Sequence, residues 1–169
     1  QGMSRPRMAI MQGVFSLQSP QDLLRKLEYD YERLRSNETD TYAAFDFFVT
    51  AEHLLDWIYP GEGNKSKRTQ CRKDEVLLQI CSHIASGAKH FKVEAKQHTT
   101  VADTRQSEGG GVMLGGATFG GAIYGAGQIL PQLVVELQGQ AAAQMGATIA
   151  ALDLATKVLN YWRALPSMQ

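Results

Sequence analysis

The sequence predicts an α+β domain that is mainly helical, with a small antiparallel sheet placed before the last helix. Apolar residues recur at steps of three and four in four segments, which is the period of a helix with one buried face. The pattern changes after Phe91, and residues 129–137 (ILPQLVVEL) form a short β-branched run typical of a strand. A length of 169 residues is enough to bury the core of one domain.

The first helix is predicted from Pro20 to about Arg35, because Ser19 offers a capping hydroxyl and proline suits the first helical position. Its inward face is marked by leucines and one tyrosine: Leu23, Leu24, Leu27, Tyr31 and Leu34. Residues 1–19 are expected to form an N-terminal arm, in which Gln1 and Gly2 look like a tag remnant. Residues 20–169 are expected to form one domain.

A second helix is predicted from Thr41 to Pro60, where proline ends the hydrogen-bond ladder. Its expected inward residues are Phe45, Phe48, Val49, Leu55 and Ile58. Residues 61–70 are expected to be a polar loop, and a third helix is predicted from about Gln70 to Phe91. After it, alternation at Phe91, Val93, Ala95 and Val101 suggests a strand.

The predicted third helix carries an apolar stripe and, beside it, a polar stripe. Leu77, Ile80, Ile84, Ala88 and Phe91 form the apolar one, and Arg72, Gln79, His83, His90 and Glu94 form the polar one. Histidine can transfer protons and arginine can hold phosphate, which are the parts of a metal-free ribonuclease. On one helix, however, Arg72 and His90 would lie about 27 Å apart. One chain could not bring both into one active site.

The last helix is predicted from steps of three and four at Ala142, Met145, Ile149, Leu152, Ala155, Leu159 and Trp162. Before it, a glycine-led five-residue repeat runs from Gly110 to Ile129 and covers most of the Gly-rich segment 109–127. Because five is odd, successive units would alternate faces on a regular strand. A loop or hairpin is the favoured interpretation, with an anion cradle and a chain-pairing surface as alternatives.

The charge is balanced overall, since 17 basic and 17 acidic residues cancel. A basic run stands out, and its members are Lys65, Lys67, Arg68, Arg72 and Lys73. It is interpreted as a solvated segment or as an RNA and phosphate contact that raises affinity without selecting a sequence. The pair Glu52 and Asp56 is interpreted as a solvated helix face rather than a cation site.

We expect no cofactor and no metal. A zinc site from Cys81, His83, His90 and His98 lacks a recognised ligand spacing. Cys71 and Cys81 are expected to be free thiols. No secretory signal and no run of 18 apolar residues is found, so a cytoplasmic location with no membrane association is the expectation.

Two segments carry a family resemblance. The first is AFDFFVTAEHLLDWIYP and the second is CSHIASGAKHF. Together they resemble uncharacterised bacterial members of the HEPN superfamily. The resemblance covers residues 41–94, and the last helix matches more loosely. The resemblance implies a four-helix bundle and a homodimer. It also implies His90 as the catalytic histidine, with Lys89 beside it as a further phosphate contact.

The ribonucleases of that family carry an arginine four to six residues before the histidine. This chain has none at positions 82–87, and His83 keeps a similar spacing with a weaker cation. The expected function is therefore a HEPN-like binding module, non-catalytic or weakly catalytic, acting on RNA or a protein partner. The alternatives are a metal-independent endoribonuclease using His90, with His83 assisting, and a structural assembly protein.

Overall fold

The computed structural model describes residues 10–107 and 131–168, which form a mainly helical α+β fold. The first half contains α1 (Pro20–Ser36), α2 (Thr41–Ile58), the short 3-10 helix η1 (Glu62–Asn64), α3 (Lys65–Asp74) and α4 (Val76–Lys89). The second half contains β1 (Val101–Ser107), β2 (Gln132–Leu137), α5 (Gly139–Met145), β3 (Thr148–Ala150), α6 (Ala151–Ala164) and η2 (Pro166–Met168). The predicted mainly helical class and the antiparallel sheet before the last helix are confirmed.

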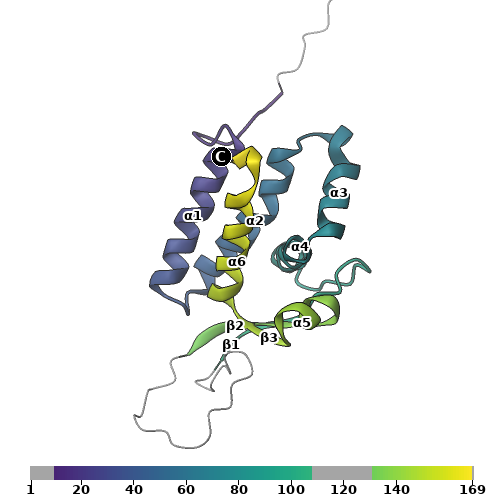
Figure 1. Ribbon diagram of the computed structural model, residues 1–169. Coiled ribbons are helices and arrows are strands. Elements are labelled where there is room, and N and C mark those ends of the chain that lie inside the picture. Colours follow the sequence, from purple (N-terminus) through teal and green to yellow (C-terminus); the bar gives the residue numbers. More distant parts are fainter. Residues whose placement is uncertain (1–9, 108–130, 169) are drawn as a thin grey trace, which may run out of the picture.

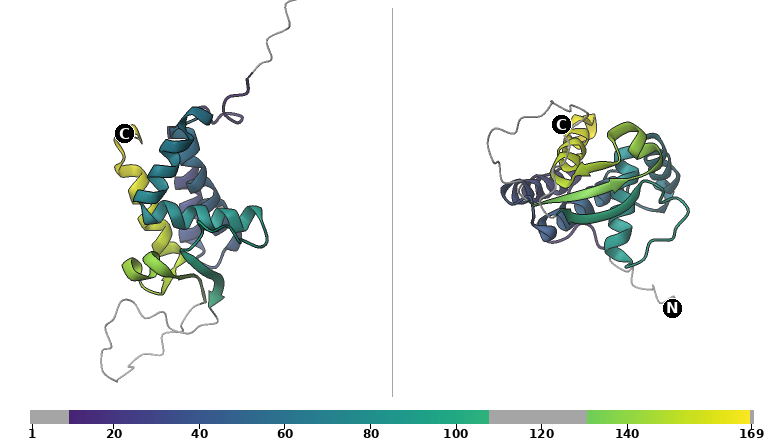
Figure 2. Two further views of the ribbon diagram at one scale, coloured as in Figure 1. Left: turned by 90° about the vertical axis from the view of Figure 1, so that its right-hand side faces the viewer. Right: turned by 90° about the horizontal axis from the view of Figure 1, so that it is seen from below.

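Three helices stand side by side, and the fourth long one crosses them. Figure 1 shows α1, α2 and α6 in the plane of the view and α4 end-on, whereas Figure 2 shows α4 along its length. The core helix α2 packs against α1, α4 and α6. The sheet lies beneath the ends of these helices (Figure 1). The four-helix bundle of the HEPN superfamily stays a prediction for this arrangement.

Helix α2 lies at the centre because one side of it combines small and large apolar residues. Ala43, Ala51, Phe47 and Leu54 are fully buried, and the alanines let neighbouring helices approach closely. Phe48 and Leu55 are buried as predicted. The predicted inward position of Phe45 is wrong, because its side chain is 49% exposed.

The predicted third helix is two helices, and the predicted loop 61–70 is largely helical. Glu75 separates α3 from α4 with an extended backbone at φ −127° and ψ 112°. Its amide donates to the carbonyl of Cys71, and its carboxylate accepts from the amide of Leu77, so one residue caps both helices. The continuous polar stripe from Arg72 to Glu94 therefore does not form, and the 27 Å estimate does not apply.

The predicted last helix is also interrupted. Gly146 has φ +89° and ψ 162°, a conformation that favours glycine, and it ends α5. Residues 148–150 then form β3 before α6 begins, so Ile149 is a strand residue rather than a helical one. The stripe from Leu152 to Trp162 lies on α6. There Leu154, Val158 and Trp162 are fully buried.

The sheet is antiparallel with the strand order β1-β2-β3. The predicted run at 129–137 is confirmed as β2 from residue 132 onward, whereas Phe91 to Ala95 form no strand and β1 starts at Val101. Phe91 is fully exposed rather than buried. The Gly-rich segment 109–127 lies outside the described residues. No helix within 10–107 and 131–168 is long and apolar enough to cross a bilayer.

Candidate functional site

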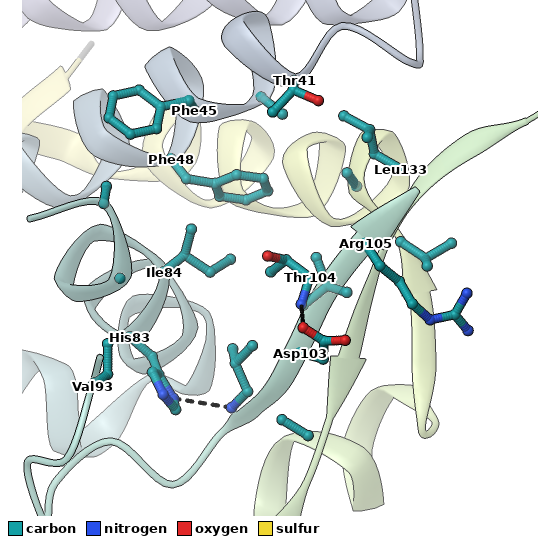
Figure 3. A pocket seen from close by; sticks show the side chains of 18 of the residues that line it. Thr41, Phe45, Phe48, His83, Ile84, Val93, Asp103, Thr104, Arg105 and Leu133 are labelled. Atoms are coloured by element: carbon teal, nitrogen blue, oxygen red, sulfur yellow. Dashed lines mark hydrogen bonds between the residues drawn. The ribbon is translucent and has the colours of Figure 1, made fainter. Parts of the chain in front are cut away.

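A groove of about 880 Å³ opens between the first half of α2, the second half of α4 and the sheet. Figure 3 shows its walls: Phe45 and Phe48 come from α2, Ile84 from α4, and Thr104 and Leu133 from the sheet. The helical side is mainly apolar, whereas the strand side combines exposed polar residues of β1 with apolar residues of β2 such as Leu133 and Val135. A groove of this size and mixed lining is typical of a binding site.

Two aromatic side chains stand at this groove with little cover from the rest of the protein. Phe45 is half exposed on α2, and Phe91, which follows the end of α4, is fully exposed. Single exposed apolar residues are common on protein surfaces, but two phenylalanines on the walls of one groove form an apolar patch. Such a patch favours contact with another molecule.

The polar wall of the groove is the outer edge of β1. Within the described residues β1 pairs only with β2, and residues 102–106 are exposed. The amide of Thr104 donates to the carboxylate of Asp103 at 2.8 Å instead of to β2. That amide therefore points to the free edge of the strand. A strand with an unpaired edge can accept another strand.

His83 and His98 lie together at the end of the groove. The Nδ1 atom of His83 accepts from the amide of Val101 at 3.0 Å, and the ring centroids of the two histidines are 5.0 Å apart. The Nε2 atom of His98 lies 2.9 Å from the hydroxyl of Ser86. Burial is the main cause that lowers the pKa of both histidines, and the neighbouring His98 lowers that of His83 further, as Arg72 does for His98. Both rings are therefore neutral at neutral pH.

This arrangement explains what the histidine pair does in the fold. Because Nδ1 of His83 accepts a backbone amide, the proton of the neutral ring is on Nε2. The two rings anchor the segment 90–100 and the start of β1 to α4. The sequence could not indicate this, because Val101 and His98 reach α4 through irregular chain.

The two histidines that the sequence singled out are not brought together. His90 caps the end of α4, where its amide donates to the carbonyl of Ser86 at 2.8 Å, and its side chain is exposed. It does not line the groove, whereas His83 does. Lys89 is exposed beside it at the last position of α4.

The basic residues of α3 divide into paired arginines and exposed lysines. Arg68 contacts Asp56 at 3.0 Å and also donates to the carbonyls of Tyr59 and Gly61. Arg72 contacts Glu52 at 2.5 Å. The lysines are exposed, and these are Lys65, Lys67 and Lys73. Lys67 lies 4.4 Å from the centre of the Tyr59 ring.

The interpretation of Glu52 as part of a solvated face is wrong. Its side chain is only 14% exposed, and its burial raises its pKa although Arg72 and Ser82 counteract the shift. Burial also raises the pKa of the nearby Cys81 thiol. The acid anchors α3 to α2, because the guanidinium of Arg72 must stay beside it.

Neither a metal site nor a disulfide is assembled in the part of the chain that the structure describes. No three histidine, cysteine or acidic side chains of residues 10–107 and 131–168 lie close enough to hold an ion. Cys71 and Cys81 are free thiols, as predicted.

Comparison with protein-family models, curated proteins and solved structures found no match, so the site is interpreted from its own geometry. The sequence reasoning singled out His83 but missed the free edge of β1 and the exposed aromatic residues. The strand VADTRQS has no apolar alternation, so nothing marked Thr104 or Asp103. Phe45 was assigned to the core because its helical spacing agreed with that of its neighbours.

Proposed function

We propose that this domain is a non-catalytic, HEPN-like protein-binding module. In this proposal an extended segment of a protein partner adds to the free edge of β1 and places its apolar side chains in the groove. The observation that carries the proposal is that the groove and the free edge meet: Thr104 lines the groove, and its amide faces outward from the sheet.

The chemistry of such a partner follows from the two walls. Strand addition needs only backbone groups, so the edge supplies affinity with little sequence preference. Side chains of an added strand alternate between its faces, and those on one face recur about every 6.6 to 6.8 Å. Those on the helical side would meet Phe45, Phe48 and Ile84 across the groove. A segment with apolar residues at alternate positions therefore fits best.

An RNA partner has weaker support. The two arginines of the basic segment already pair with acids of α2, which leaves Lys65, Lys67 and Lys73 as its exposed cations. Three phosphate contacts would give weak, salt-sensitive binding. The endoribonuclease alternative also gains no support, because His83 holds a backbone amide and His90 stands apart from the groove.

The proposal can be tested by selecting binders to the intact chain from a displayed library of random twelve-residue peptides. Selected peptides are expected to carry apolar residues at alternate positions. Their binding should be lost in Thr104→Pro, which removes the outward amide but keeps the pairing with β2. Thr104→Val is the matched control, since it retains the amide, and it should bind with unchanged affinity.

Two results would overturn the proposal. One is that selected peptides bind Thr104→Pro as well as they bind the original chain. The other is that no peptide is selected, whereas labelled single-stranded RNA binds and the triple replacement of Lys65, Lys67 and Lys73 by serine reduces its salt dependence. Each lost phosphate contact should lower that slope by about 0.7.

A further inference from the structure

We infer that the partner at the free edge is a second copy of this chain. In this arrangement the β1 strands of two copies pair antiparallel about a two-fold axis through Thr104, and the two three-stranded sheets become one. The inference rests on the proposed strand addition and names its partner, with one change to it. On the face that it shares with Thr104, a second β1 carries Ala102 and Gln106 rather than large apolar side chains. It is carried by the charge pattern of β1, which is complementary to itself.

The complementarity follows from the order of three residues. When Thr104 lies opposite its own copy, the residue before it lies opposite the residue after it in the other strand. Asp103 then faces Arg105 of the second copy, and the two-fold axis repeats this contact. Opposite charges at directly facing positions stabilise an antiparallel pair. A shift of the register by one or two residues would lose both contacts.

Asp103 needs such a cation. Across β1 and β2 it lies directly opposite Glu136, and two acids in facing positions repel each other. Arg105 contacts Glu136 at 2.7 Å from the diagonal position. Among the described residues Asp103 makes no ion pair. A second Arg105, supplied by the other copy, would complete a row of alternating charge on this face of the sheet.

The backbone groups also fit this register. The amide of Thr104 points away from β2 and is held by the Asp103 carboxylate at 2.8 Å. On pairing, the carbonyl of the opposite Thr104 accepts this amide, and the carboxylate becomes free to meet Arg105 of the second copy. The hydrogen bond is exchanged rather than lost, so no buried donor is left without a partner.

The axis through such a strand pair is perpendicular to the sheet, so both helical layers lie on the same side of it. The two grooves then face each other across the joined strands. Phe45 and Phe91 are the exposed aromatic residues of each groove, and we expect the second copy to approach them. This arrangement would remove apolar surface from water at both of them.

The test is a charge exchange followed by mixing. The intact chain should be a dimer in sedimentation equilibrium over about 1 to 500 μM. Asp103→Arg and Arg105→Glu each place two like-charged pairs at the axis, so each should weaken dimerisation about tenfold or more. Mixed in equal amounts, they should form a heterodimer, because each mixed contact again joins opposite charges. This rescue depends on the two-fold register.

Two controls separate this effect from unfolding. Circular dichroism should show that the variants keep their helical content. Arg35→Glu is the matched control for Arg105→Glu. Each variant reverses the charge of an arginine in an exposed ion pair, with Glu32 on α1 and with Glu136 on the sheet. Arg35→Glu should not change the dimer. Thr104→Pro should be monomeric, whereas Thr104→Val should remain dimeric.

The outcomes distinguish the inference from the proposed function. A chain that is monomeric at all concentrations overturns the two-fold pairing, and so does a dimer that Asp103→Arg, Arg105→Glu and Thr104→Pro all leave intact. Absence of rescue on mixing also overturns it. If peptide selection still gives edge-dependent binders in those cases, strand addition stands and the partner is another protein. If neither dimer nor peptide is found, both proposals fall.

Discussion

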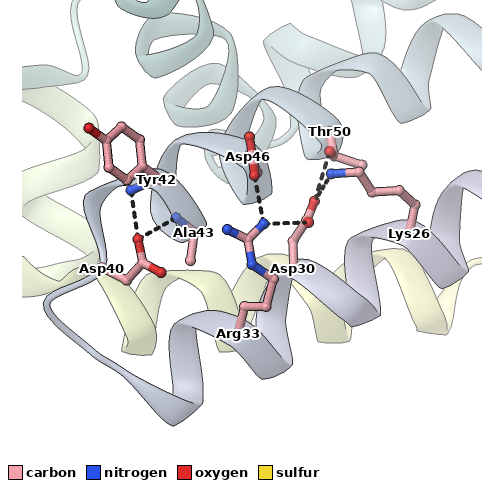
Figure 4. Close-up of polar contacts among 8 residues, drawn as sticks. All are labelled: Lys26, Asp30, Arg33, Asp40, Tyr42, Ala43, Asp46 and Thr50. Carbon is pink, nitrogen blue, oxygen red and sulfur yellow. Dashed lines mark hydrogen bonds and ion pairs between the residues drawn. The ribbon is translucent and has the colours of Figure 1, made fainter.

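A buried carboxylate between α1 and α2 leads to an asymmetric prediction about stability. Asp30 is fully buried, and its carboxylate is held by Lys26 and by the hydroxyl of Thr50 at 3.0 Å. Arg33 lies 3.7 Å from the other carboxylate oxygen and bonds more closely to Asp46, at 2.7 Å. Figure 4 shows this cluster. The Oδ1 atom of Asp30 has no hydrogen-bond partner within the described residues.

The perturbation is to remove either the cation or the anion of the close pair. Lys26→Met leaves a carboxylate in the interior with one hydroxyl and a more distant arginine. Breaking a buried pair in this way costs about 3 to 5 kcal/mol. Because Thr50 and Arg33 remain, we expect the lower value, about 3 kcal/mol. In a domain of this size that corresponds to a fall in Tm of about 6 to 12 °C.

Removal of the anion should cost much less. In the double variant Asp30→Leu/Thr50→Val, two apolar side chains replace the carboxylate and the hydroxyl that donates a hydrogen bond to it. Lys26 is 35% exposed and Arg33 retains Asp46, so neither cation is left buried without water or a partner. We expect a change in unfolding free energy within about 1 kcal/mol of zero, because the cost of desolvating the ion disappears.

Urea unfolding followed by tryptophan fluorescence measures both values. The midpoint should shift at constant slope if only stability has changed. The prediction is wrong if the double variant is destabilised as much as Lys26→Met, since the cluster would then contribute net stability as an ion pair. It is also refuted if Lys26→Met is neutral, because the carboxylate would then have another source of compensation.

Three further predictions concern other parts of the fold. Arg72→Ala should cost about 2 to 4 kcal/mol in urea unfolding, because it leaves Glu52 buried without its cation, and Glu52→Gln introduced into that variant should recover part of the loss. Folding lowers the pKa values of His83 and His98, so the unfolded chain binds protons at a higher pH than the folded chain does. Thermal melts should therefore show that stability is retained above about pH 6.5 and is lost as the pH falls below it. Replacement of both histidines by glutamine should weaken this pH dependence. Gly146→Ala should cost about 1 to 3 kcal/mol and lower Tm, because φ +89° is strained for alanine.

Helices with explicit start signals were predictable from the sequence. Ser19 accepts the amide of Asp22, and Pro20 opens α1 as predicted. Asp40, which directly precedes the predicted second helix, caps α2 by accepting the amides of Tyr42 and Ala43. In these helices the local capping chemistry and the apolar period agree. The start of each helix is therefore determined by residues close to it in sequence.

The two interrupted helices show where local patterns fail. Glu75 is a good helix former, and the residues on both sides of it are compatible with a helix. Its cap exists because α4 turns to cross α2, which is a tertiary effect. Gly146 is a residue that can end a helix, but an isolated glycine within a helical pattern is also tolerated at modest cost. Its conformation and the pairing of Ile149 with Val135 in the sheet end that helix.

The candidate site was less predictable than the fold because its residues are joined by long-range contacts. His83 was identified, but its role depends on Val101 and His98, which are remote in the sequence. Phe45 has the spacing of a core residue, but it is half exposed on the wall of the groove. Periodicity identifies the apolar residues of a helix. It does not determine whether another element covers them.

The polar sequence of β1 is consistent with a selective edge. A free, apolar edge strand would pair with many sequences and promote aggregation, and charged residues normally prevent this. Asp103 has that protective effect in the single chain, because its carboxylate occupies the amide of Thr104. The same carboxylate would be released by a strand that supplies both a carbonyl and a cation in register. Thr104 and Arg105 give the β1 strand of a second copy this carbonyl and this cation, so the edge would favour its own copy over a segment that has no cation in register.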